Sequence, residues 1–435
     1  MSDWNFKILE EWDEKICELA KTAGLDWHPI IYETCDYYEM IGNMAYHGLP
    51  SHYSHWSFGK SFERTHQLYN AGVEGLPYEL IINANPSIAY LMRENPAYLQ
   101  LLIMCHCVGH SDFFKNNRMF AHTRPDQITL RFRNARNRIQ KYIEDPSIGI
   151  EKVENILDTT HSMKYQINRF HITRPTHEEL KEEYTQKIKN DEDGVYENFD
   201  IEKIPLEPEF DIMNFLIQHA RHLKDWERDI LEIVRDESYY FMPQIQTKIM
   251  NEGWASFWHY RLMHQLELPQ KFHIPFLKSH NQVIRPHIGG VNPYHLGFYM
   301  FKHIEEKFGI DRCFKAREIC HDASFLREYL DEEICYELNL FSYSKKKGGY
   351  SIDEISDSDG WKIVKNDLIK GVGDGTIPRI YVEEVLPGDV LMLQHEHDGR
   401  DLELNYADNV IKNVRALWRD EVKLTTIVEE EPWEI

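Results

Sequence analysis

The spacing of apolar residues along the chain predicts a mainly helical protein. Four apolar residues of the N-terminal segment recur at helical intervals: Leu9, Trp12, Ile16 and Leu19. This spacing is typical of a helix with one buried face. Similar periodicity predicts helices over 101–120, 129–170 and 211–264 and then onward to about residue 340. Pro243 is expected to divide the third of these stretches into two helices.

Two segments depart from this pattern. Residues Tyr78–Met92 are expected to form a short strand, a turn and then a helix, with Asn85 as the helix cap and Pro86 at the first helical position. Residues 174–208 are rich in charge, poor in branched aliphatic residues and broken by prolines. Such a composition predicts an exposed excursion, part helix and part loop.

The last hundred residues show strand patterns. Alternating runs predict strands over 377–385 and 390–397, and the Asp398-Gly399 pair predicts a hairpin turn after the second run. An amphipathic helix ending near Trp418 and a strand at 422–428 follow. This alternation predicts a small α+β domain with an antiparallel sheet.

The predicted fold class is therefore mainly α. We expect a large helical domain with a zincin-like or bundle-like core, followed by the small α+β domain. The expected boundaries are 1–340 for the helical domain, 341–360 for a polar, turn-rich linker and 361–435 for the small domain.

The composition excludes some classes of protein function. The 435 residues are 42% hydrophobic and 28% charged, which is typical of a globular protein. A formal net charge of −23 argues against binding to the nucleic-acid backbone. Seven scattered cysteines without a C-x-x-C pair, an acidic N-terminus and the lack of a long apolar run predict a soluble, reduced, cytoplasmic protein without a transmembrane segment.

The candidate chemistry centres on His106 and His110, four residues apart on the expected helix over 101–120. That spacing places two imidazoles on one helix face, where both can bind one metal ion, as in H-E-x-x-H zinc hydrolases. Cys107 stands where that motif has its glutamate base. Core or capping histidines are the alternative interpretation of the same pair.

Glu252 is the candidate third ligand. It lies in a helix surrounded by aromatic residues, where an unpaired carboxylate is costly, and Gly253 beside it indicates a kink or a close approach by another backbone. Asp158 and His161, three residues apart, can also contribute to a metal site. The candidate bases are His259, His161, Glu79 and Asp112. The candidates to stabilise an oxyanion are Tyr239, Tyr240 and Arg285.

Several blocks of sequence resemble the stage V sporulation protein R (SpoVR) family. They are HWSFGK (55–60), INANPSIAYLM (82–92), the histidine helix followed by SDFFKNN (111–117), TKIMNEGWASFWH (247–259), NPYHLGFYMF (292–301) and HEHDGRDLEL (395–404). The resemblance implies a role in building the peptidoglycan cortex of spores. It also implies a serine kinase and a von Willebrand-like protein as partners, because their genes are neighbours in many genomes.

Three functional hypotheses follow. The first is a metal-dependent hydrolase or amidase with zinc on His106, His110 and Glu252, where the NEGWA segment resembles the glutamate helix of gluzincins. The second is a non-enzymatic scaffold or regulator of cortex assembly with a structural histidine cluster. The third is a di-iron carboxylate protein that also uses Asp158 and His161.

Overall fold

The computed structural model describes residues 3–46, 48, 52–70, 79–170, 174–191, 194–196, 199–287, 290–346 and 349–435. The chain divides into two compact units. The first unit combines Met1–Asn137 with Pro243–Thr376, and the second combines Arg138–Met242 with Ile377–Ile435. The helices α5 (Ile128–Glu144) and α9 (Asp225–Gln246) carry the chain between the two units.

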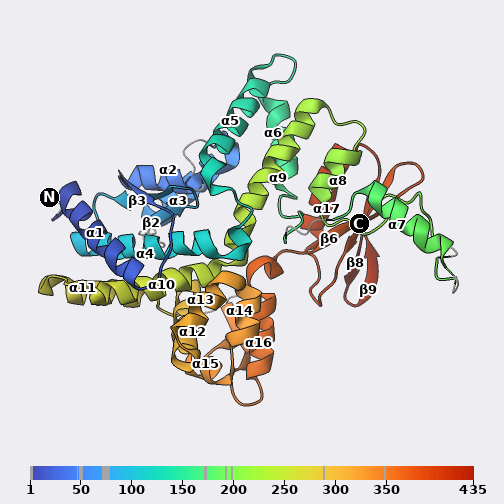
Figure 1. Ribbon diagram of the computed structural model, residues 1–435. Coiled ribbons are helices and arrows are strands. Elements are labelled where there is room, and N and C mark those ends of the chain that lie inside the picture. The colour runs from blue at the N-terminus through green and yellow to red at the C-terminus, as the bar shows by residue number, and fades with distance from the viewer. Residues whose placement is uncertain are drawn as a thin grey trace. The chain divides into compact units, whose positions relative to one another are not determined.

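The first unit is mainly helical (Figure 1). Its helices are α1 (Phe6–Thr22), α2 (Tyr37–Ala45), α3 (Trp56–Asn70), α4 (Ala97–Asn116), α10 (Lys248–Gln265), α11 (Gln270–Val283), α12 (Pro293–Phe308), α13 (Ile310–Ile319), α14 (Asp322–Tyr329), α15 (Glu332–Glu337) and α16 (Trp361–Lys370). Its strands are β1 (Ile30–Cys35), β2 (Glu79–Ile82), β3 (Ser87–Met92), β4 (Phe341–Lys346) and β5 (Gly349–Ile355). Short 3-10 turns are η1 (Arg118–Phe120), η2 (Pro125–Gln127) and η3 (Gly373–Thr376).

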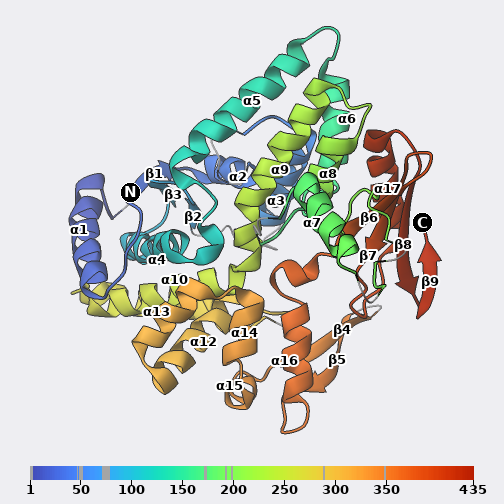
Figure 2. The same cartoon turned by 45° about the vertical axis from the view of Figure 1, so that its right-hand side comes forward.

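Two buried helices, α4 and α10, form the centre of this unit and lie side by side (Figures 1 and 2). Nearly every residue of α4 is buried, because α4 packs against the sheet β1-β3-β2 as well as against α10. Glycines permit the close packing: a Cβ on Gly109 would lie 2.7 Å from the Cα of Ala255 in α10. On the other side of α10, a Cβ on Gly253 would lie 2.4 Å from the Cα of Gly297 in α12. The prediction of a close backbone approach at Gly253 is thus confirmed.

The second unit contains α6 (Ile150–His161), α7 (His177–Lys189), α8 (Ile212–His219) and α17 (Leu404–Trp418). Its sheet is built from β6 (Ile380–Leu386), β7 (Val390–His395), β8 (Val422–Val428) and β9 (Glu431–Glu434), in the order β6-β7-β8-β9. Figure 2 shows α17 beside this sheet. Its buried residues are Ile411, Val414, Leu417 and Trp418, so the amphipathic helix that the sequence predicts to end near Trp418 is present.

The prediction of a mainly α chain with a small C-terminal α+β region is confirmed. The sheet of that region is mixed rather than antiparallel, because β7 and β8 run parallel. The Asp398-Gly399 hairpin is also wrong: β7 ends at His395 and the loop leads into α17. The hairpins of this sheet lie between β6 and β7, where Gly388 and Asp389 have φ of 90° and 59°, and between β8 and β9, where Glu429 and Glu430 have φ of 49° and 68°.

Two helix predictions are corrected. Residues Ser87–Met92 form the strand β3 rather than a helix, because they pair with both β1 and β2. A short apolar run fits either structure, and these partners decide between them. Pro243 lies inside α9, and the break follows at Thr247, where Asp322 accepts hydrogen bonds from the backbone N–H groups of Ile249 and Met250 and so begins α10.

Two further segments differ from expectation or refine it. Residues 341–360, predicted as a linker, hold the hairpin of β4 and β5 and lie in the first unit. The excursion 174–208 contains α7, and Thr176 and Glu179 form a capping box at its start. In the described part of the chain no helix is both long and apolar enough to cross a bilayer. The zincin-like or bundle-like character of the core stays a prediction.

Candidate metal centre

The histidine pair lies at the middle of α4. His106 and His110 are one turn apart on the same face, both are buried, and their ring centroids are 4.5 Å apart. The helix is buried on almost all sides, so both imidazoles lie in the interior of the first unit. The sequence spacing therefore indicates this face correctly.

The helix α10 brings Glu252 to the pair. The Oε2 atom of Glu252 is 3.3 Å from Nε2 of His110 and 3.8 Å from Nε2 of His106. The glycine contacts at Gly253 and Gly109 let α10 approach closely enough for this short carboxylate arm to reach α4. The predicted meeting of the NEGWA segment with the paired imidazoles is present in the structure.

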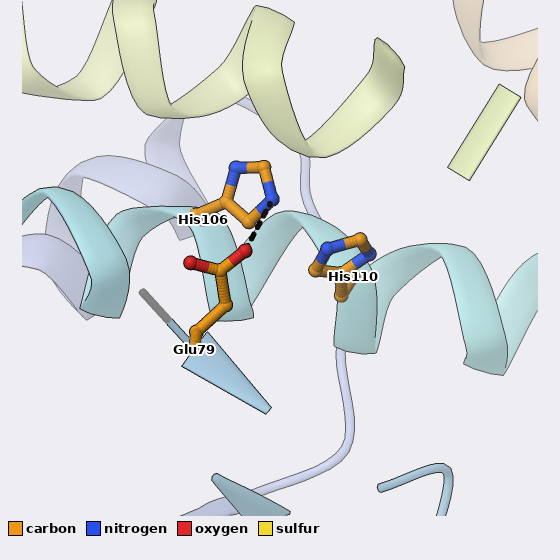
Figure 3. Close-up of side chains that lie close together, drawn as sticks. All are labelled: Glu79, His106 and His110. Carbon is orange, nitrogen blue, oxygen red and sulfur yellow. Dashed lines mark ion pairs between the residues drawn. The ribbon is translucent and has the colours of Figure 1, made fainter. Parts of the chain in front are cut away.

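A second carboxylate comes from the first residue of β2. Oε1 of Glu79 lies 3.5 Å from Nε2 of His106, and Figure 3 shows Glu79 reaching from its strand toward this ring. Glu79, His106 and His110 each offer a ligand atom, and these three atoms lie within 4.8 Å of one another. Two imidazoles and two carboxylates thus surround one small volume.

The outer nitrogens of both rings are engaged elsewhere. Nδ1 of His110 hydrogen-bonds Oδ1 of Asn251 at 2.8 Å, and Nδ1 of His106 lies 2.8 Å from Nδ1 of His259. Because an amide oxygen only accepts, Nδ1 of His110 carries the proton and its Nε2 is left as a lone pair, unless the ring is doubly protonated. Asn251 was not predicted as a site residue, although it directly precedes Glu252.

The electrostatics of the cluster resemble an ion pair. Burial acts to raise the pKa of Glu252, but the neighbouring His106 and His110 lower it overall to well below its usual range. Burial acts to lower the pKa of His110, but Glu252 and Asn251 raise it overall. Tyr294, at the start of α12, has its pKa raised well above its usual value by burial and by the carboxylates of Glu252 and Glu79.

The cluster has the features of a cation site. Nε2 of His106 and Oε2 of Glu252 are buried and have no hydrogen-bond partner among the residues that the structure describes. Two ligands that each lie about 2.0–2.1 Å from a tetrahedral zinc ion are about 3.3–3.4 Å apart. The separations of 3.3, 3.5 and 3.8 Å between these nitrogens and carboxylate oxygens are close to that value. Imidazole and carboxylate donors therefore fit zinc in both chemistry and spacing.

Three other predicted residues serve different purposes. Asp112 lies on α4 two residues beyond His110, and its carboxylate accepts hydrogen bonds from Trp254 Nε1 and from the backbone N–H of Asp26, each at 2.8 Å. His259 lies behind His106 and also contacts His280, so both of its nitrogens are occupied by other rings. Arg285 is exposed, and its carbonyl accepts a hydrogen bond from Asn292. Asp112 and Arg285 therefore lie outside the cluster, and His259 touches it only through Nδ1 of His106.

The remaining candidates belong to the second unit. His161 ends α6, Asp158 lies one turn before it, and Tyr240 is buried in α9 with Tyr239 beside it. The hydroxyl of Tyr239 donates a hydrogen bond to Asp211 at 2.7 Å. The cluster described above is built by residues of the first unit, and a metal-binding role for Asp158 and His161 stays a prediction.

A second grouping in the first unit consists of His303, Asp331 and Glu333. Lys307 pairs with both of its carboxylates, since Nζ of Lys307 lies 2.8 Å from Asp331 and 2.5 Å from Glu333, while His303 bonds Asp331 at 3.0 Å. This grouping is a surface ion-pair network, which distinguishes it from the buried cluster on α4.

The chain is thus a mainly helical protein with a buried His-His-Glu-Glu cluster. The family model described as "SpoVR like protein" matches residues 3–377, and that described as "SpoVR-like C-terminal domain" matches residues 378–429. The chain belongs to the SpoVR family, which confirms the resemblance seen in the sequence. It is 33% identical over 478 aligned residues to "Uncharacterized protein YcgB" of Escherichia coli, covering 97% of this chain and 92% of that protein. No solved structure matches the chain.

Proposed function

We propose that the chain is a metal-dependent hydrolase in which His106, His110 and Glu252 hold a zinc ion and Glu79 is the general base. One observation carries the proposal: both imidazoles turn their Nε2 atoms toward Glu252, and that of His106 also lies 3.5 Å from Glu79, while their Nδ1 atoms are held by outer partners. Buried nitrogen and oxygen atoms without a hydrogen-bond partner destabilise the fold unless a bound ligand, such as a metal ion, contacts them. A zinc ion bound there would polarise a carbonyl group and lower the pKa of a water molecule toward about 7.

The distances favour different roles for the two carboxylates. An oxygen of Glu252 lies within 3.8 Å of the Nε2 atoms of both histidines, which suits a ligand of the same ion, whereas Glu79 is paired with that of His106 at 3.5 Å. Glu79 is therefore the residue that accepts a proton from the attacking water. Tyr294 faces the same carboxylates, and because its pKa is raised its hydroxyl stays protonated and can donate to a developing oxyanion.

Cys107 does not supply the base. Its side chain is fully buried in the apolar core, and burial together with Glu79 raises the pKa of the thiol well above its usual value. The thiol therefore stays protonated at neutral pH and cannot accept a proton from water. Glu79 fills the function that the altered motif lacks, from a different element.

The family name supports a role in sporulation, and we propose that the hydrolase acts during formation of the peptidoglycan cortex of the spore. Its substrate would be a cell-wall precursor or a protein of the same process, carrying the amide bond that a zinc site of this kind hydrolyses. A serine kinase and a von Willebrand-like protein remain the predicted partners.

Metal analysis of the purified full chain tests the proposal. We expect about one equivalent of zinc, lost on dialysis against a chelator and lost in His106→Ala and Glu252→Ala. His273→Ala, which removes an exposed histidine of α11, is the matched control and should keep the metal. Two equivalents of iron would instead support the di-iron hypothesis. A folded wild-type chain that binds no metal would support the scaffold.

Catalysis is tested separately with Glu79→Gln. This variant should keep zinc and lose hydrolysis of muropeptide amides and of an unfolded protein substrate, because it removes the base and keeps the ligands. A Glu79→Gln variant with wild-type turnover of either probe would rule out the assigned base.

A further inference from the structure

Three imidazoles form a continuous buried chain that begins at the cluster. Nδ1 of His106 lies 2.8 Å from Nδ1 of His259, and Nε2 of His259 lies 2.7 Å from Nδ1 of His280. The three rings come from α4, α10 and α11, and their exposed fractions are 2%, 0% and 2%. At such burial each ring takes its hydrogen bond from the next one.

The direction of this chain follows from counting protons. A hydrogen bond between two ring nitrogens holds one proton, so one ring donates and the other accepts. If Nε2 of His106 is a metal ligand, its Nδ1 carries the proton and donates to His259. Nδ1 of His259 is then bare, its proton is on Nε2, and it donates to Nδ1 of His280. The proton of His280 is consequently on Nε2.

We propose that His259 and His280 are positioning residues of the metal centre, holding His106 in the tautomer that presents Nε2 as a lone pair. This inference rests on the proposed zinc site. Without an acceptor at its Nδ1, His106 would be free to place its proton on Nε2, which blocks metal binding. His259 and His280 therefore hold the tautomer of His106, as Asn251 holds that of His110.

The character of the outer partners has a chemical consequence. Metal-binding histidines commonly donate to a carboxylate or a backbone carbonyl. Here both ligands donate to uncharged side-chain groups, an imidazole and an amide. All negative charge of the centre then comes from Glu252 and Glu79, which face its interior. The net charge around a divalent ion would thus be set by these two carboxylates and not by the groups that hydrogen-bond the Nδ1 atoms.

His280 is the member of the chain that can be tested without touching the cluster. Its ring packs against Tyr260 and Phe298, with centroids 4.7 and 5.1 Å away, and its Nδ1 accepts from His259. An asparagine Oδ1 can take the place of an imidazole Nδ1 as an acceptor, whereas leucine cannot. The pair His280→Leu and His280→Asn therefore separates the hydrogen bond from the packing.

The experiment measures zinc affinity by competition with a chromophoric chelator, using the full chain. We expect His280→Leu to bind zinc about 10- to 100-fold more weakly, which is typical for loss of an outer partner, and His280→Asn to recover most of that loss. His273→Leu, on the same helix and exposed, is the control and should bind as the wild type does.

A second readout does not depend on any variant folding. In the zinc-loaded wild type with labelled histidines, NMR should show His259 and His280 protonated on Nε2 and His106 on Nδ1. The opposite tautomers, or a His280→Leu variant that loses thermal stability but keeps wild-type zinc affinity, would overturn the inference alone. A wild type that binds no zinc would overturn both this inference and the proposed function.

Discussion

The packing of α10 against α12 leads to a sharp prediction for Gly253→Ala. A Cβ at this position would lie 2.4 Å from both the Cα and the carbonyl carbon of Gly297 and 2.8 Å from its oxygen. Carbon atoms in contact prefer about 3.5–4.0 Å, so the backbones must separate by about 1 Å. No side-chain rotation can relieve a contact between backbones.

The helix α10 cannot move in the opposite direction either. On that side the Cα of Ala255 already fills the space beside Gly109 of α4, where an added Cβ would lie 2.7 Å away. The strain must therefore displace α12, which carries Tyr294. Overpacking costs about 3 kcal/mol at the upper end of its usual range, and alanine recovers about 1 kcal/mol of helix propensity. The net loss is about 2 kcal/mol.

Thermal and urea unfolding measure this loss, and Gly42→Ala is the matched control. Gly42 lies inside α2 with nothing within 4 Å of an added Cβ, so the control should gain up to about 1 kcal/mol. We expect Gly253→Ala to lower the melting temperature by about 4–8 °C and to weaken zinc binding through the adjacent Glu252. A Gly253→Ala variant as stable as the control would refute the close approach of α10 and α12.

Three further predictions concern buried carboxylates and the core thiol. Asp112→Ala should cost about 3–5 kcal/mol in urea unfolding, because it leaves Arg317 buried and unpaired, yet zinc affinity should not change; a lost zinc site with intact stability would contradict this assignment. Burial raises the pKa of Asp322 to about 7 although backbone N–H groups of α10 lower it, so the folded state binds this proton more tightly than the unfolded state. Its contribution to stability therefore falls as the pH rises from about 4 to 7, and Asp322→Asn should remove that part of the slope; parallel pH profiles would contradict it. Cys107→Ser should keep zinc and hydrolysis, measured as for the wild type, because the buried thiol takes no part in the centre.

The helices that carry the site were predictable because they are long and rich in apolar and aromatic residues on almost every side. The spacing of His106 and His110 determines their common face on any helix, and the aromatic surroundings of Glu252 indicate that its carboxylate needs a partner. These features are local or compositional. They do not depend on knowing which other elements are neighbours in space.

The parts that were missed depend on partners distant in the sequence. Ser87–Met92 becomes a strand only because β1 and β2 flank it, and that same sheet places Glu79 beside α4. The helix break after Pro243 falls at Thr247 because Asp322, more than seventy positions later in the chain, caps the next helix. His280 becomes part of the centre through His259 and through no motif of its own.

The altered motif on α4 shows why the geometry of a site decides more than its sequence signature. A base next to the first histidine must point toward the metal, but residue 107 of this helix faces the apolar core, where its exposed fraction is 0%. A carboxylate there would be buried without a partner, at a cost of several kcal/mol. The fold instead places Glu79 at the start of a strand, 3.5 Å from His106. The absence of the motif glutamate is thus a consequence of the packing of α4, and it does not count against a hydrolytic centre.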